Sequence, residues 1–99
     1  MKGFGMIEVK QTAGGDPMRF EVAVTDGATT THHEVTMSPA DFERLALGRT
    51  QAQMIEAAFR FLLDREPKES ILGRFDVSVI ETYFPEFERT LPGYLPSRP

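Results

Sequence analysis

Residues 50–64, TQAQMIEAAFRFLLD, form the stretch that decides the fold. The pattern Thr50-x-x-Gln53 is typical of a capping box, so we expect a helix to begin here. At about 100° per residue, the apolar side chains that follow spread over roughly 240° of the helix circumference. A helix that lies on one sheet needs only about half of that arc. We therefore expect two covers for this helix: a sheet on one side, and the opening residues, a second copy of the chain, or both, on the other.

The residues before this helix predict a sheet and a shorter helix. Apolar and polar side chains alternate over residues 6–10, 20–24 and 29–37, as in strands with one buried face. Asp26-Gly27 is a favoured pair for a tight hairpin turn, which predicts an antiparallel meander of these strands. Ser38-Pro39 predicts the start of a helix, and Gly48 supplies a left-handed stop.

The residues after the long helix predict shorter elements. Pro67 ends the long helix, because the residue before a proline is disfavoured in helical geometry. A short helix is expected over residues 68–74. Residues 75–84 fit two patterns, since their first half alternates like a strand, whereas a cap at Asp76 and the apolar spacing behind it favour a helix. We prefer the helix, which Pro85 would end.

These patterns together predict an α+β fold. A three-stranded antiparallel β-meander is followed by one long central helix and shorter C-terminal helices. A chain of 99 residues has the size of one domain. We place that domain at residues 1–90 and expect residues 91–99, which are rich in proline and glycine, to form a flexible tail.

The composition limits the compartment and the classes of partner. The chain has no cysteine, which excludes disulfides and thiolate chemistry and suits a reducing compartment. Its formal net charge is −4 and its basic residues form no cluster, which weighs against a nucleic-acid partner. No apolar run approaches the roughly 18 residues of a membrane-spanning helix, and the start MKGFGMIEVK lacks the features of a signal peptide. We expect a cytoplasmic protein.

Residues that could carry catalysis or hold a metal occur without the spacing that these functions need. His32 and His33 are the only histidines, and neighbouring strand residues point to opposite faces, so they cannot hold one metal ion. His33, on the core-facing side, could instead tune a dimer contact. The serines lie in no nucleophile elbow, and the glycines match no phosphate-binding loop. We expect no metal, no cofactor and no enzymatic activity.

The aromatic residues near the C-terminal end are the candidates for a binding surface: Tyr83, Phe84, Phe87 and Tyr94. In one interpretation Tyr83 or Phe84 seals the edge of the core. In the other, some of the four rings stay exposed and form a docking patch, because tyrosine and phenylalanine concentrate at interfaces. Base stacking would use the same rings but requires a basic groove, which the sequence does not indicate.

Two stretches of the sequence carry family resemblances. Residues 31–67 resemble the ribbon–helix–helix family of dimeric DNA-binding repressors and antitoxins, in which a strand, a short helix, a glycine-containing turn and a longer capped helix follow one another. That resemblance implies base contacts from the strand and phosphate contacts from the start of the longer helix: His32, Glu34 and Thr36, then Arg49 and Thr50. Separately, the run LLDREPKESILGRF…SVI…YFPEFE is similar to a group of small uncharacterised bacterial α+β proteins, which implies no activity.

The function that we expect is a small, non-enzymatic interaction or regulatory module. It would act through contacts with a protein partner and would form a homodimer. A ribbon–helix–helix-like DNA-binding transcriptional regulator or antitoxin is the alternative. A small enzyme is a second alternative, and it would need a deep pocket that holds a carboxylate with a raised pKa.

Overall fold

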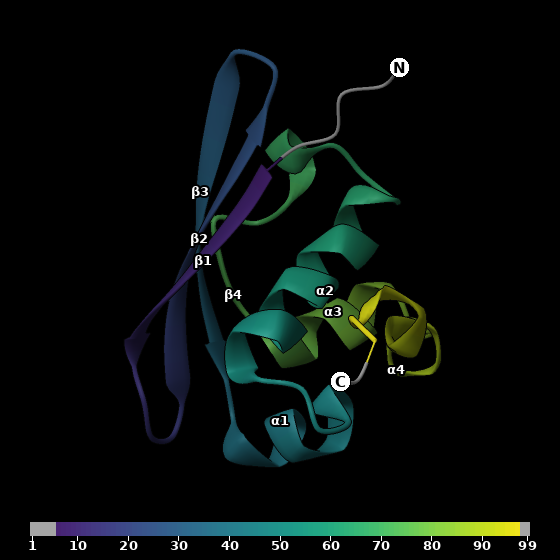
Figure 1. The fold of residues 1–99 in the computed structure, drawn as a ribbon. Helices are drawn as coiled ribbons and strands as arrows, with labels where there is room; N and C mark the ends of the chain where they lie inside the picture. Colours follow the sequence, from purple (N-terminus) through teal and green to yellow (C-terminus); the bar gives the residue numbers. More distant parts are fainter. Residues whose placement is uncertain (1–5, 98–99) are drawn as a thin grey trace.

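The computed structural model describes residues 6–97, which form two layers (Figure 1). One layer is a four-stranded sheet with the strand order β1-β2-β3-β4. The other layer consists of helices, which all lie on one face of the sheet; within the described range, none of them is long and apolar enough to span a membrane. This arrangement confirms the α+β class. The strands are β1 (Met6–Ala13), β2 (Met18–Asp26), β3 (Thr29–Met37) and β4 (Arg74–Asp76).

The first three strands form the predicted antiparallel meander, and a fourth strand extends it. The β2–β3 hairpin closes at the pair Asp26–Thr29, and Gly27 in its turn has a φ of +66°. β4 pairs with β3 in parallel, which places Phe75 opposite Val35. The prediction of three strands is therefore wrong in number, because residues 74–76 form a short fourth strand beside β3.

The first helix has the ends that the sequence predicts. α1 (Pro39–Ala46) begins behind Ser38, whose hydroxyl accepts a backbone N–H of the first turn at 3.1 Å. The helix stops where the chain enters the left-handed region, at Leu47 with a φ of +51° and at Gly48 with a φ of +86°. Glycine adopts this left-handed conformation without steric strain, so Gly48 favours the stop. Leu47 has a side chain and is slightly strained in the same conformation.

The long helix, α2 (Gln51–Leu63), begins with the predicted capping box. The Thr50 hydroxyl accepts the Gln53 N–H at 3.1 Å, and the Gln53 side-chain oxygen accepts the Thr50 N–H at 2.9 Å. The helix ends before Pro67, as expected. The short helix that we expected next is a single 3₁₀ turn, η1 (Lys68–Ser70).

α2 is covered on two sides, as its apolar circumference predicts. Its buried side chains are Met54, Ile55, Ala57, Ala58, Phe59, Phe61 and Leu62. The sheet covers one side (Figure 1). The C-terminal segment covers the other with α4 (Phe87–Thr90), η2 (Leu91–Tyr94) and Leu95. We expected the opening residues, a second copy or both on this side, and that expectation is corrected: the second cover is the C-terminal segment of the same chain, so the burial of α2 does not require a second copy.

The start of the predicted tail is part of the core. Leu91 is 1% exposed and Leu95 is 8% exposed, and the Arg49 side chain binds the carbonyl of Pro96 at 2.9 Å. The expectation of a free tail from residue 91, and of a domain that ends at residue 90, is therefore corrected for the described part of this segment. Prolines and glycine dominate its composition, but two leucines among them supply the apolar anchors. Residues 98 and 99 lie outside the described residues.

The stretch for which both a strand and a helix were considered contains one of each. β4 leads directly into α3 (Val77–Tyr83), and Asp76 caps this helix by accepting the Ser78 backbone N–H at 3.0 Å. Asp76 also accepts a hydrogen bond from the Thr36 hydroxyl on β3. Burial acts to raise the pKa of Asp76, but these hydrogen bonds outweigh it, so the pKa lies below its ordinary value.

We predict that Leu91→Ala lowers the free energy of unfolding by about 2–5 kcal/mol, since it leaves a cavity in the core. Leu47→Ala is the matched control, because Leu47 is 47% exposed; its cost should stay within about 0.5 kcal/mol. Urea unfolding measures both. Equally small losses would show that the C-terminal segment does not complete the core.

We predict that Asp76→Ala costs about 1 kcal/mol near neutral pH, because it removes the cap of α3. The folded-state pKa of Asp76 is lowered, so the stability that its carboxylate contributes is present above about pH 4 and is lost as the pH falls through the lowered pKa. The gap in unfolding free energy between parent and variant should therefore narrow in acid. A gap that stays constant through the acid range would contradict this role.

Candidate docking site

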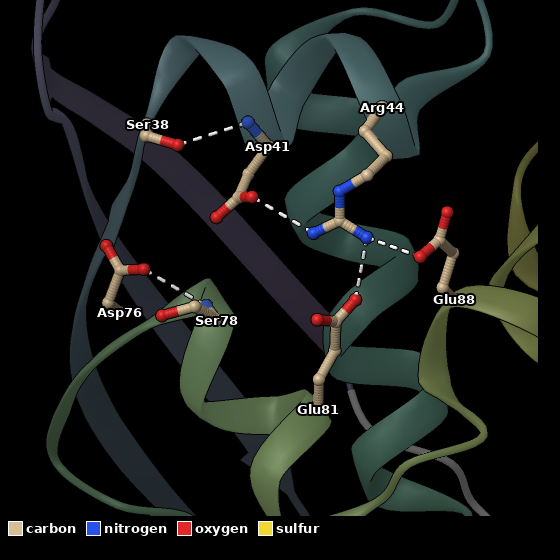
Figure 2. A network of polar contacts seen from close by, with 7 residues as sticks. All are labelled: Ser38, Asp41, Arg44, Asp76, Ser78, Glu81 and Glu88. Atoms are coloured by element: carbon tan, nitrogen blue, oxygen red, sulfur yellow. Dashed lines mark hydrogen bonds and ion pairs between the residues drawn. The ribbon is translucent and has the colours of Figure 1, made fainter.

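Three acidic side chains, one each from α1, α3 and α4, converge on Arg44 of α1 (Figure 2). The guanidinium binds Glu81 of α3 at 2.8 Å, Asp41 of its own helix at 3.0 Å, and Glu88 of α4. The hydrogen bonds with Glu81 and Asp41 raise the pKa of Arg44 above its ordinary value. The network joins three helices, and its carboxylates are held by a cation instead of being free for proton transfer.

Three of the four aromatic residues predicted as an interaction surface pack around one ring, that of Phe61 in α2. Its centroid lies 4.9 Å from that of Phe87 and 5.8 Å from those of Phe84 and Tyr94, all in edge-to-face geometry. Phe87 is 0% exposed, so its prediction as an interaction residue is wrong. Its ring instead covers Phe61 on the side of α2 that the sheet does not reach. Phe84 and Tyr94 are half-buried.

Arg65 strengthens this aromatic cluster. Its guanidinium lies 3.7 Å from the Phe61 centroid and binds Glu86 at 3.1 Å. A hydrogen bond with Tyr94 and the pair with Glu86 raise the pKa of Arg65, against the opposing effect of burial. The Tyr94 hydroxyl in turn donates to Asp64 at 2.6 Å. These contacts fasten the C-terminal segment to the end of α2.

Tyr83, the fourth predicted residue, is 66% exposed and lines an apolar hollow of about 280 Å³. The hollow lies between the end of α2, the segment around η1, β4 and α3. Leu72, which is 47% exposed, lines it as well. Its buried wall consists of side chains that are at most 8% exposed: Leu62, Ile71, Phe75 and Ile80. We call this hollow the candidate docking site.

Few polar groups line the candidate docking site. Glu66 and Ser70 contribute a carboxylate and a hydroxyl. Glu66 forms no ion pair with any residue that the structure describes. The nearby Lys68 binds Glu69 at 2.7 Å instead, and this hydrogen bond lowers the pKa of Glu69. The hollow can therefore accept an apolar group that has a positive charge beside it.

The lining offers no acid–base pair of the kind that a small hydrolytic enzyme would use. Of the described residues that line the hollow, none is a histidine, and Glu66 is the one carboxylate. The pKa of Glu86, close by in sequence, is lowered by a backbone hydrogen bond and by Arg65, whereas a general acid needs a raised pKa.

His33 helps to position one wall of the hollow. It is 4% exposed, whereas His32 is exposed on the other face, as the strand period predicts. The His33 ring contacts the Thr31 hydroxyl at 2.8 Å and the Leu72 carbonyl at 2.7 Å; since a carbonyl only accepts, Nδ1 carries the proton. The ring thus links β3 to the segment that presents Leu72. His33 makes this contact within the chain, whereas a dimer contact was the role that we considered for it. Within residues 6–97, no three metal-binding side chains come together.

The strand residues named by the ribbon–helix–helix resemblance lie on the outer face of the sheet. His32 is exposed there. The Thr36 hydroxyl is bound to the cap of α3, and Glu34 pairs with Arg19 at 3.5 Å and Arg74 at 3.2 Å. In that family the strand pairs with its copy in a second subunit, whereas β3 already pairs with β2 and with β4.

The residues expected to contact phosphate are engaged within the chain. Arg49 donates to the carbonyls of Leu47 and Pro96, each at 2.9 Å. The Thr50 hydroxyl serves in the capping box with Gln53. Both residues lie at the start of α2 in the helical layer, so the structure does not gather them with the strand residues into one surface.

Comparisons of the chain with protein-family models, curated protein sequences and solved structures find no match. Glu66 and Leu72 line the hollow but are not among the interaction residues that the sequence predicted.

We predict a clear separation between two of the aromatic residues. Phe87→Ala should lower the free energy of unfolding by about 3–5 kcal/mol, because it empties the core beside Phe61. Tyr83→Ala, at a 66% exposed position, should change it by less than about 0.5 kcal/mol. Thermal or urea unfolding of both variants checks this, and a large loss in Tyr83→Ala would place that ring in the core.

Proposed function

We propose that this protein is a non-enzymatic interaction module that binds a partner segment at the candidate docking site. The observation that carries the proposal is the apolar hollow, where exposed Leu72 and Tyr83 stand beside Glu66, a carboxylate without an ion-pair partner among the described residues. The partner segment would carry a large apolar side chain next to a lysine or arginine.

The size and lining of the hollow support a side chain as its occupant. A cavity of about 150 Å³ is enough for a benzene ring in an engineered protein core, and this hollow measures about 280 Å³. Drug-sized ligands mostly occupy pockets of about 300–1,000 Å³, so one or two apolar side chains fit the space better than a larger cofactor. Exposed apolar side chains gathered at one hollow are typical of binding sites.

Charge supports a cation beside the apolar anchor. The chain has a formal net charge of −4. The basic residues nearest to the hollow in sequence are each bound to a carboxylate other than Glu66: Arg65 to Glu86, Lys68 to Glu69 and Arg74 to Glu34. A lysine or arginine of the partner would therefore meet Glu66 without a competing internal cation. Such a pair at the edge of a site contributes mainly to association rate and selectivity.

A selection of short random peptides displayed on phage tests the proposal. Enriched sequences should carry a large apolar residue adjacent to lysine or arginine, and a synthetic peptide of that sequence should bind the protein. The double variant Leu72→Ser/Tyr83→Ser should weaken this binding by more than about tenfold, because it removes the exposed anchors of the site. Glu66→Gln should weaken it less and reduce its salt dependence.

Leu47→Ser is the control for this experiment, because it removes an equally exposed leucine away from the hollow. Its peptide affinity should match that of the parent. Enrichment of acidic peptides, or binding that survives unchanged in the Leu72→Ser/Tyr83→Ser variant, would remove the proposal.

A further inference from the structure

β1 is the long open edge of the sheet. Within residues 6–97 it pairs with β2 on one side and with no strand on the other. The opposite edge, β4, has only 3 residues, whereas β1 has 8. A long edge strand presents a row of unpaired N–H and C=O groups, which is a template for a further strand.

The apolar side chains of β1 are incompletely covered. Ile7 and Val9 pack on the core but are only partly buried. Met6 on the other face is 60% exposed. A neighbouring strand would cover part of each of these side chains, which favours pairing at this edge.

The charges of β1 make the strand complementary to itself. Glu8 and Lys10 are both exposed and lie on the face that carries no helices. Neither forms an ion pair with another described residue. Lys10 lies opposite Glu21 of β2 in the sheet register, yet the two side chains are not paired. One negative and one positive side chain, two positions apart, remain available at the open edge.

We propose that β1 pairs antiparallel with the β1 of a second copy, around a two-fold axis at Val9. In this register Glu8 of each copy faces Lys10 of the other, and the two Val9 side chains face each other. An axis at Glu8 or at Lys10 would instead place like charges directly opposite, which is destabilising. Charge therefore selects the register, and the same patch serves both copies, as a two-fold interface requires.

This pairing joins the two sheets into one and keeps both helical layers on the same side. Directly opposite residues of antiparallel strands lie on one face, so an axis that passes through a residue position preserves the inner and outer faces across the junction. The candidate docking site stays open, because it lies beside β4 at the far edge. The dimer is thus independent of the proposed docking function and does not depend on any exposed side of α2.

Sedimentation equilibrium of the full chain, with charge-exchanged variants, tests this inference. The parent should show a monomer–dimer equilibrium. Glu8→Lys and Lys10→Glu each turn both cross-strand attractions into repulsions, so each alone should dimerise about tenfold or more weakly than the parent. The double variant Glu8→Lys/Lys10→Glu should recover the parental affinity, because its charges are exchanged but still opposite.

Mixing the two single variants in equal amounts gives the sharpest result. The lysines of one variant then face the glutamates of the other, so a heterodimer should form although neither variant forms a strong homodimer. Glu43→Lys is the control, since it makes the same charge change at an exposed position of α1; its dimer should match the parent. A parent that stays monomeric, a dimer that both single variants leave intact, or a mixture that forms no heterodimer would each overturn the inference.

Discussion

Phe61 projects from a side of α2 that the sheet does not cover, and its burial depends on residues 87–95 folding back across the helix. Phe87 and Leu91 fill this side, and each is at most 1% exposed. Burying a large apolar side chain contributes about 1.5–3 kcal/mol, whereas solvent screens the Arg65–Glu86 ion pair, which therefore contributes less. Aromatic packing therefore dominates this cover, and the charged contacts around it fix its orientation.

The position of the candidate docking site follows from how the chain returns to the sheet. After α2 the chain passes through η1 and comes back beside β3 as β4, and α3 then begins at once. His33 holds the segment before β4 through the Leu72 carbonyl, and Asp76 holds the start of α3 while binding Thr36. Hydrogen bonds thus anchor both sides of the hollow to β3, so the shape of the cavity is set by the edge of the sheet and not by a loop alone.

Local signals in the sequence were sufficient for the meander, for both major helices and for their caps. Ser38, Thr50 with Gln53, and Asp76 all act as their residue types and positions predict, because capping depends on neighbours only a few residues away. The two-sided burial of α2 was also predictable, since it follows from the angular spread of one helix. The identity of the second cover of α2 could not be predicted. The proline and glycine residues around Leu91 and Leu95 suggest a flexible segment, and the burial of the two leucines depends on long-range packing.

The candidate site was predictable only in part for the same reason. Tyr83 belongs to it, but Phe87 does not, and nothing local distinguishes two aromatic residues four positions apart on either side of a proline. A strand was one of two interpretations of residues 75–84, and the helix was preferred. β4 has only 3 residues, and its partner β3 lies some forty positions earlier, so local alternation could not establish the strand.

The distance in sequence between α2 and its second cover has a consequence for partly folded states. Any state in which residues 87–95 detach leaves the Phe61 side of α2 open to water, although the sheet and the helix can stay formed. An apolar face exposed in this way is a site for contact between chains and for chaperone binding. The C-terminal segment therefore protects the protein from aggregation as well as completing its core.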